Sequence, residues 1–252
     1  MLVEISVVII TYNEEKNIAR CLDSVQGVSK DVVVVDSYST DRTKEICIQK
    51  GARFVEHKFD GHIEQKNYAV SQAKSQYVLS LDADEALTEE LRETILNIRY
   101  NWEQDAYVFN RLTNYCGTWI KHSGWYPDKK IRLWDSTKGR WGGDNPHDKV
   151  IMDKGASLKQ IKQDILHYSY YTVDDHWKQV AYFTDINSKA AFNKGKKSSS
   201  FKIFYKSAFK FFRDYILKKG FLDGEAGFSI AKISAKATAM KYRKLLALNK
   251  NK

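Results

Sequence analysis

The sequence predicts an α/β fold in which helices cover a mostly parallel, mixed sheet. Buried-strand patterns and helical patterns alternate over the first hundred residues, and polar residues follow the predicted strands. Strand–helix–strand units of this length join parallel strands by right-handed crossovers. Such sheets bind their ligands at the carboxyl ends of the strands. We therefore expect a binding site at the ends of four strands, at residues 5–10, 32–35, 52–55 and 76–81.

The spacing of apolar residues supports each of these elements. Residues 5–10 form a run of mostly β-branched side chains, which is typical of a strand buried on both faces. One helical face is predicted by apolar residues at i, i+3, i+4 and i+7, namely Ile18, Cys21, Leu22 and Val25. Further helices are expected from Thr40 to Gly51, over residues 61–74, and over residues 88–98 with Thr88 as the N-cap.

The second half of the chain has a different character. Residues 101–170 are rich in Trp and Tyr, and we interpret them as a mixed or antiparallel extension of the sheet. The strand patterns there lie at residues 107–112, 131–134 and 165–168. A helix is expected at 173–193, followed by C-terminal amphipathic helices at 198–219 and 226–248.

Cysteine usage and hydropathy argue against a disulfide-rich, a secreted and a membrane-spanning protein. The three cysteines, Cys21, Cys47 and Cys116, are too few and too widely spaced for a disulfide framework or a zinc site. The residues before the first strand lack the features of a signal peptide. No apolar run approaches the roughly 18 residues that span a bilayer. We therefore expect a cytoplasmic protein.

The net charge of +10 is concentrated near the C-terminus. Residues 194–252 hold 16 Lys and Arg against 3 Asp and Glu, whereas the other residues hold 25 against 28. One side of the helix expected at 198–219 is apolar, with Phe201, Phe204, Tyr205, Ala208, Phe211, Phe212 and Tyr215, and the other side carries Lys202, Lys206, Lys210 and Arg213. This pattern is typical of a helix on an anionic membrane surface, at the inner face of the cytoplasmic membrane. Packing against the rest of the chain and a homodimer contact are the alternatives.

Asp82-Ala83-Asp84 directly follows the fourth predicted strand. Two carboxylates one residue apart at a strand end can share a hard divalent cation such as Mn²⁺ or Mg²⁺. A nucleotide diphosphate needs such a cation to neutralise its phosphates and its leaving-group charge. An Asp-X-Asp triplet is also common in surface turns, so its position after a buried strand is what favours a metal site.

Other polar residues at strand ends are candidates for binding a nucleoside. Asp36 ends the second strand, where a carboxylate commonly binds a nucleoside. Thr11, Tyr12 and Glu14 end the first strand, and the Tyr12 ring could stack on a base. The alternative for Glu14 is a first-turn carboxylate favoured by the helix dipole. Lys66, before the fourth strand, is either a phosphate or base ligand or a solvated lysine.

Residues 142–148 are predicted to form a flexible loop with two carboxylates and a histidine. Transfer of a group to a hydroxyl needs a base that takes the hydroxyl proton. Asp148 and Asp144 are the candidates for that base. An ordinary turn rich in Gly, Asn and Asp is the alternative.

Three motifs in order resemble those of inverting family 2 glycosyltransferases, which have the GT-A, Rossmann-like nucleotide-diphospho-sugar transferase fold. They lie at residues 7–15, 32–43 and 81–85. Residues 124–134, the His147-Asp148 pair and residues 213–224 look like signatures of the subgroup that includes lipopolysaccharide core β-glucosyltransferases. The resemblance implies a GT-A domain over 1–195, with a nucleotide-binding half at 1–100 and an acceptor-binding half at 101–195, and a basic helical extension over 196–252.

The resemblance also implies roles for individual residues. Thr11, Tyr12, Glu14 and Asp36 would hold the uridine of a UDP-sugar, and Lys66 would lie near its base or phosphates. Asp84 would be the principal metal ligand, and Asp82 would contact the ribose or the metal. Asp148 would be the base, with Asp144 as the alternative, since that subgroup usually has Glu where this chain has Asp148. Trp125, Tyr126 and Arg132 would shape the site for the sugar or for a saccharide or lipid-linked acceptor.

Two other functions are weighed against this one. A sugar nucleotidyltransferase needs a Gly-rich phosphate loop after the first strand, and residues 11–15 contain no glycine. A basic nucleic-acid-binding protein would use the lysines and aromatic residues near the C-terminus. However, those lysines and rings are expected on opposite helix faces, which favours a membrane surface and leads us to expect no nucleic-acid partner.

Overall fold

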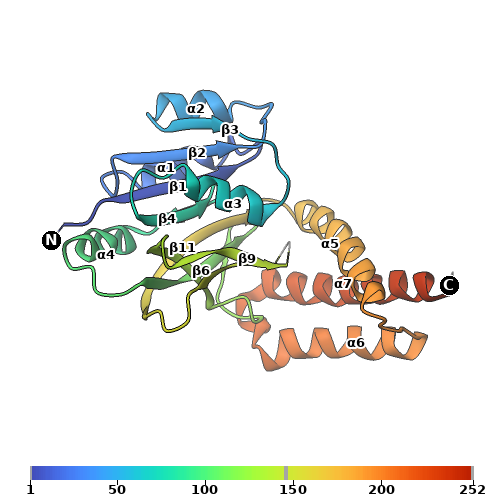
Figure 1. The fold of residues 1–252 in the computed structure, drawn as a ribbon. Coiled ribbons are helices and arrows are strands. Elements are labelled where there is room, and N and C mark those ends of the chain that lie inside the picture. Colours follow the sequence, from blue (N-terminus) through green and yellow to red (C-terminus); the bar gives the residue numbers. More distant parts are fainter. Residues whose placement is uncertain (1, 145–146, 251–252) are drawn as a thin grey trace. The chain divides into compact units, whose positions relative to one another are not determined.

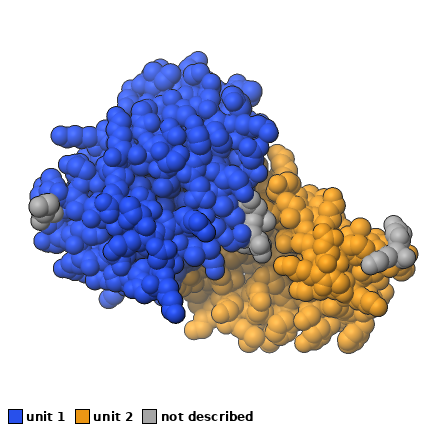
Figure 2. Space-filling view, in the orientation of Figure 1, with its two compact units in different colours: residues 1–111, 128–168 blue, residues 112–127, 169–252 orange. Residues whose placement is uncertain are grey.

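The structure, a computed structural model, describes residues 2–144 and 147–250. The chain forms two compact units (Figure 2): unit 1 comprises residues 1–111 and 128–168, and unit 2 comprises residues 112–127 and 169–252. The boundary expected at residue 195 lies inside unit 2. In chain order the elements are β1 (Ile5–Thr11), α1 (Ile18–Ser24), β2 (Asp31–Asp36), α2 (Thr43–Gln49), β3 (Arg53–Glu56), α3 (His62–Ser71), β4 (Tyr77–Asp82), β5 (Glu85–Leu87), α4 (Glu89–Tyr100), β6 (Ala106–Tyr115), β7 (Thr118–Ile120), β8 (Asp128–Asp135), β9 (Gly139–Asp144), β10 (His147–Met152), β11 (Leu158–Tyr170), α5 (Val173–Asn193), α6 (Ser200–Phe212), the π-helix η1 (Arg213–Leu217), the 3₁₀-helix η2 (Gly220–Asp223) and α7 (Gly224–Lys250).

The main sheet confirms the expected α/β class. Its strand order is β3-β2-β1-β4-β8-β6-β11-β5, with β7 paired to β6. Figure 1 shows β3, β2, β1 and β4 side by side. Strands β3, β2, β1 and β4 are parallel, whereas β8 pairs with both β4 and β6 in the antiparallel direction. The parallel half thus comes from the βα repeats, and the antiparallel half from the later segment rich in Trp and Tyr. Thr88 caps α4 as expected, since its hydroxyl accepts from the backbone N of Leu91.

Both faces of the parallel half are buried. Side chains of β1 alternate between two hydrophobic clusters: Ile5, Val7 and Ile9 pack with residues of α1, α2 and α4, and Val8 packs on the opposite face with residues of α3. The run of apolar residues in β1 is explained by this double burial. It also leaves only the strand ends of this half open to a ligand.

The prediction of a flexible loop at 142–148 was wrong, because the described residues there belong to two strands. Strands β9 and β10 form an antiparallel hairpin in which Val150 lies opposite Trp141, and both side chains are buried in the cluster beside α3. Gly142 leaves room for the Ile151 side chain, because a Cβ at that position would lie 2.7 Å from its Cδ1 atom. Apolar burial on the hairpin therefore outweighs the turn-like composition of the segment.

In unit 2, helices α5 and α6 both pack against α7. The helix expected over 198–219 ends earlier, because a π-helix follows Phe212 and Lys219 then takes the left-handed conformation at φ 54°. Gly220 lies close to the preceding turn, and a Cβ there would be 2.7 Å from the carbonyl oxygen of Asp214. None of the helices among residues 2–144 and 147–250 combines the length and the hydropathy needed to cross a membrane.

His176 makes the stability of unit 2 dependent on pH. It is 5% exposed, its Nδ1 lies 3.1 Å from the Tyr115 hydroxyl, and burial lowers its pKa from 6.5 to about 4. Below about pH 6.5 the unfolded chain binds a proton that the folded chain excludes, so this stability is lost as the pH falls toward 4. We expect a loss of about 3 kcal/mol over that interval.

This expectation is measured by denaturant unfolding of the whole chain near pH 7 and near pH 4. The His176→Gln variant should show a flatter pH dependence, because Gln can still bond to Tyr115 but does not titrate. His62→Gln, in unit 1, is the control and should keep the wild-type slope. An equal dependence of unfolding free energy on pH in the wild type and in His176→Gln would show that the His176 ring does not cause it.

Candidate active site

Polar residues end three neighbouring parallel strands of unit 1. Thr11 ends β1, Asp36 ends β2 and Asp82 ends β4. In the strand registers Thr11 lies opposite Asp36, and Asp82 lies opposite Ile10. The sheet therefore gathers at one edge residues that are far apart in the sequence. This is the edge at which sheets of this class bind ligands.

Two buried cations surround the carboxylate of Asp82. Lys66 Nζ lies 3.0 Å from Asp82 Oδ1, and Arg132 Nη2 donates to Oδ2 at 3.0 Å. The side chains of Lys66 and Arg132 are only 5% and 2% exposed. Burial opposes ionisation of Asp82, but the charges of Lys66 and Arg132 outweigh it and hold the pKa of this carboxyl far below its usual range. Asp82 is therefore ionised, and its charge is already balanced by the protein.

Glu85 fixes one of these cations, a role that the sequence did not suggest. Its buried carboxylate accepts hydrogen bonds from Arg132 at 2.5 Å and from Arg111 at 3.2 Å. Its other oxygen accepts from the backbone N of Asp82 at 3.1 Å. Glu85 thus holds the Arg132 guanidinium beside Asp82. The sequence signal for it was only its place directly after Asp84.

Replacing Glu85 with Gln is expected to destabilise the fold by about 3 kcal/mol, because Arg111 and Arg132 would lose a buried counter-charge. Denaturant unfolding measures the change. Glu45→Gln is a matched control, since Glu45 pairs with Arg42 on the surface, where ion pairs contribute little. Equal losses in the two variants would contradict the role of Glu85.

Asp84 lies beside His167, which the sequence patterns did not single out. His167 Nε2 is 3.1 Å from Asp84 Oδ2. Strand β11 brings the ring there, because it pairs with β5 in a register that places His167 opposite Glu85. Burial opposes ionisation of Asp84, but the neighbouring His167 lowers the pKa of the carboxyl. A carboxylate oxygen and an imidazole nitrogen thus meet at the same edge of the sheet.

The donor atoms of Asp84 and His167 suit a divalent cation that is shared with a ligand. Within residues 2–144 and 147–250, no group of three His, Cys, Asp or Glu side chains is arranged to hold a metal ion by itself. Magnesium, however, is usually held by one or two carboxylates together with substrate phosphates and water. Asp84 supplies such a carboxylate, and the His167 nitrogen lies beside it as a second ligand atom. Asp82 is less suited to this role, because Lys66 and Arg132 already neutralise its charge.

Lys66 also connects Asp148 of β10 to this cluster. Its Nζ lies 2.8 Å from Asp148 Oδ2, and it stands 4.3 Å from the centroid of the Trp141 ring. The ring face and the two carboxylates together stabilise the buried ammonium. Asp148 and Asp82 therefore both form ion pairs with Lys66. The side chain of the alternative candidate, Asp144, lies outside the described residues.

The ends of β1 and β2 provide further polar groups. Asp36 is 1% exposed and accepts hydrogen bonds from the backbone N and the hydroxyl of Ser39 at 2.7 and 2.5 Å. Thr11 Oγ1 is buried and has no hydrogen-bond partner among the described residues. A buried hydroxyl of this kind is normally satisfied, so a ligand is a natural partner for it. The Tyr12 ring, next along the chain, is 58% exposed.

Glu14 shares the surroundings of Asp84. Burial, followed by the negative charge of Asp84, raises the pKa of Glu14 to about 7. The Asn17 amide donates to the Glu14 carboxylate at 2.7 Å, which holds the side chain in place. Near neutral pH this carboxyl can therefore both accept and donate hydrogen bonds.

The residues expected to shape the sugar or acceptor site are divided between the units. Arg132 belongs to unit 1 and lies beside Asp82, as described above. Trp125 and Tyr126 belong to unit 2. There the Trp125 ring packs against Tyr115 and Tyr170, with ring centroids 5.9 Å apart in both pairs. Trp125 thus contributes to the aromatic core of its own unit.

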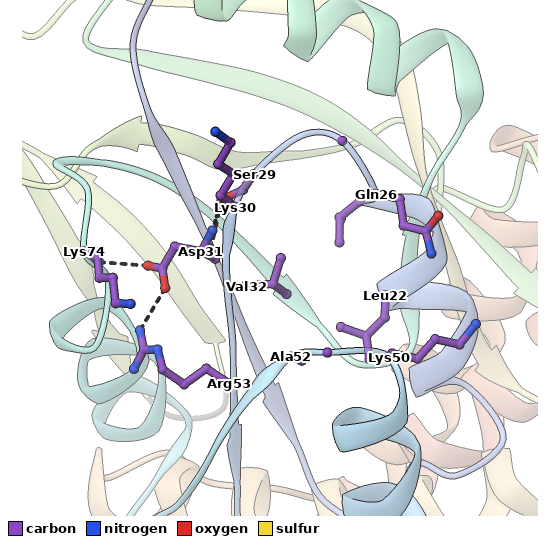
Figure 3. A pocket seen from close by; sticks show the side chains of 13 residues that line it. Leu22, Gln26, Ser29, Lys30, Asp31, Val32, Lys50, Ala52, Arg53 and Lys74 are labelled. Carbon is purple, nitrogen blue, oxygen red and sulfur yellow. Dashed lines mark hydrogen bonds and ion pairs between the residues drawn. The ribbon is translucent and has the colours of Figure 1, made fainter.

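A cavity of about 280 Å³ lies away from these groups, at the amino ends of β2 and β3 (Figure 3). Asp31 lines it and accepts hydrogen bonds from Arg53 at 3.1 Å and from the backbone N of Lys74 at 2.9 Å. These bonds connect the starts of β2 and β3 to the segment before β4. The cavity is therefore separate from the candidate active site at the carboxyl ends.

Comparisons with known proteins identify the family of this chain. The family model described as glycosyl transferase family 2 matches residues 6–213. An uncharacterized glycosyltransferase of Rickettsia typhi is 29% identical over 98% of this chain and 88% of its own length. The lipopolysaccharide core biosynthesis glycosyltransferase LpsC of Rhizobium meliloti is 24% identical over 89% of this chain and 85% of its own. Among solved structures, TarS 1–349 of S. aureus in complex with UDP covers 98% of this chain and 91% of its own at 17% identity, with a TM-score of 0.48. From the family match over most of its length, the chain belongs to glycosyl transferase family 2.

Proposed function

We propose that this protein transfers a hexose, most simply glucose, from a UDP-sugar to an acceptor and inverts the anomeric carbon. The acceptor in this proposal is a saccharide or a lipid-linked saccharide of cell-surface polysaccharide or lipopolysaccharide. Membership of the family and the name of the Rhizobium meliloti relative support this choice. The observation that carries the proposal is the meeting of Asp84 with His167, and of Lys66 with Asp82 and Asp148, at one sheet edge.

The strand ends would hold the donor nucleotide. Asp36 and the buried hydroxyl of Thr11 would bind the uridine, with the exposed Tyr12 ring against the base. Glu14 would accept or donate a hydrogen bond there. Lys66 would lie near the diphosphate, because its ion pair with Asp82 holds the ammonium at this edge.

Asp84 and His167 would hold Mn²⁺ or Mg²⁺ against the diphosphate. A divalent cation, when bound, neutralises the charge that develops on the departing UDP. Strand β11 keeps His167 beside Asp84. Asp82 would stay paired with Lys66 and Arg132 and would orient the ribose side of the donor.

Asp148 would act as the base. As the acceptor hydroxyl oxygen forms its bond to the anomeric carbon, Asp148 takes the hydroxyl proton and the bond from that carbon to the diphosphate oxygen breaks. The electron pair of the broken bond leaves with UDP. Attack on the face opposite the leaving group converts an α-linked donor into a β-glycoside. Lys66 would steady the Asp148 carboxylate in position before the transfer.

The proposal is tested by a donor-hydrolysis screen. Wild-type protein is incubated with uridine and guanosine diphosphate sugars, with Mn²⁺, with Mg²⁺ and with a chelator. We expect release of UDP from a UDP-hexose only when a divalent cation is present. Equal hydrolysis of guanosine diphosphate sugars, or full activity in the chelator, would contradict the proposal.

A further inference from the structure

The outward face of α6 is aromatic and largely exposed. Phe201 and Phe204 are 78% and 72% exposed, and Tyr205, Phe209 and Phe212 are 44–51% exposed. The ring of Tyr205 stacks on those of Phe201 and Phe209, with centroid distances of 6.3 and 6.1 Å. We call these five residues the aromatic face. Contiguous exposed apolar patches are unusual on soluble proteins and mark sites of interaction.

Other rings of α6 and of η1 pack within unit 2. Phe211 and Tyr215, which we expected among the outward residues, instead contact the Phe228 ring of α7 at 5.9 and 5.7 Å. Helix α6 lies along α7 (Figure 1) and packs against it with Phe211, while the aromatic face stays exposed. The aromatic face is therefore not needed to hold α6 in place.

The turn after α6 adds exposed apolar side chains. Ile216 and Leu217 of η1 are 45% and 57% exposed, and Phe221 and Leu222 of η2 are 47% and 56% exposed. We call these four residues the apolar tip. The aromatic face and the apolar tip follow one another along the chain without an exposed acidic residue between them, since Asp214 is buried.

Positive charge accompanies these apolar residues. Lys206, Lys218 and Lys219 are exposed, and none of them has an ion-pair partner among residues 2–144 and 147–250. Lys210 and Arg213, in contrast, both pair with the buried Asp214, at 2.8 Å in each case. Unit 2 therefore presents unbalanced ammonium groups beside exposed rings and aliphatic chains.

We propose that the aromatic face and the apolar tip bind an anionic lipid surface. The rings and aliphatic chains would enter the boundary between headgroups and acyl chains, and Lys206, Lys218 and Lys219 would meet the lipid phosphates. The purpose of this binding rests on the proposed function. The lipid surface is where the enzyme would reach a lipid-linked acceptor.

An anionic bilayer explains this surface better than a second copy of the chain or a nucleic acid. A symmetric dimer through the aromatic face would bring its lysines toward their own copies, and like charges oppose such contact. Nucleic-acid bases stack on rings, but they give no partner to Ile216, Leu217 or Leu222. Acyl chains can contact both the aromatic rings and the aliphatic side chains.

The test is flotation of the purified full chain with lipid vesicles. One set of vesicles is phosphatidylcholine alone, and the other contains about one third phosphatidylglycerol. We expect binding only to the anionic vesicles. The double variant Phe201→Asp/Phe204→Asp should bind about tenfold more weakly, because both rings lose their contact with the acyl boundary. Both side chains are more than two-thirds exposed, so the variant is expected to fold.

Tyr182→Asp is the matched control. Tyr182 is 61% exposed on α5 of the same unit and lies outside the aromatic face, so its replacement should leave flotation unchanged. Donor hydrolysis in solution should be the same in the double variant and the wild type, which separates this proposal from the proposed function. Unchanged flotation of the double variant, or a wild type that ignores anionic vesicles, would overturn it. A dimer that the double substitution converts to a monomer would overturn it too.

Discussion

Replacing Asp84 with Asn is expected to lower the rate of glycosyl transfer by roughly 10³-fold. The amide keeps the size of the side chain but removes the charge that would hold a divalent cation next to the diphosphate. His167 alone is then left as a protein ligand. The measurement is UDP release from a UDP-hexose at saturating Mn²⁺, together with the denaturation midpoint as a check on folding.

Asp153→Asn is the control for this variant, because Asp153 is an exposed carboxylate in the turn after β10. It should turn over like the wild type. His167→Ala should resemble Asp84→Asn in direction, since both side chains contribute to the same ion. Full metal-dependent turnover by Asp84→Asn would show that Asp84 does not hold the metal ion.

The second large effect is expected at Asp148. Asp148→Asn should lower kcat by roughly 10³-fold, because an amide cannot take the acceptor proton. The KM for the donor should change little, since the amide oxygen can still accept the hydrogen bond from Lys66. Steady-state kinetics with varied donor and varied acceptor separate these two parameters.

The alternative base gives the matched comparison. If Asp144→Asn produced the large fall in kcat and Asp148→Asn did not, Asp144 would be the base instead. Asp148→Glu should recover part of the activity, because the carboxylate is retained on a side chain one methylene longer. A large rise in donor KM with unchanged kcat in Asp148→Asn would show that this residue serves binding, not proton transfer.

The parallel half of the fold could be predicted because its signals are local. The apolar run of β1 and the helical spacing of Ile18, Cys21 and Leu22 both report burial that the structure contains. The positions of Asp36 and Asp82 at strand ends were also visible, since strand ends follow directly from strand patterns.

The remaining parts of the site depend on contacts between distant segments. His167 reaches Asp84 only through the pairing of β11 with β5, and nothing in the sequence around His167 specifies that register. The β9–β10 hairpin was missed because its Gly and Asn content is typical of a turn, while its burial depends on Trp134 of a different strand. Glu85 had no predicted role of its own, because its partners, Arg111 and Arg132, come from β6 and β8.

The prediction that the aromatic residues of α6 share one outward side was confirmed for some of them and wrong for others, for the same reason. The sequence placed Phe201, Phe204 and Phe211 on one apolar side. Only packing against α7 divides them, because Phe211 contacts Phe228 and the other two remain exposed. A periodic pattern can predict that a helix has an apolar side, but it does not specify which part of that side a neighbouring helix will cover.

The most direct test of the central claim is the affinity for Mn²⁺, measured by calorimetry with and without UDP. The claim is that Asp84 and His167 hold a divalent cation together with the donor diphosphate. We predict weak binding of Mn²⁺ alone, since two protein ligands are too few for a tight site, and much tighter binding once UDP supplies phosphate oxygens. His167→Ala and Asp84→Asn should each abolish most of that gain. UDP binding that is equally tight in the presence of a chelator, or a gain that survives both substitutions, would contradict the claim.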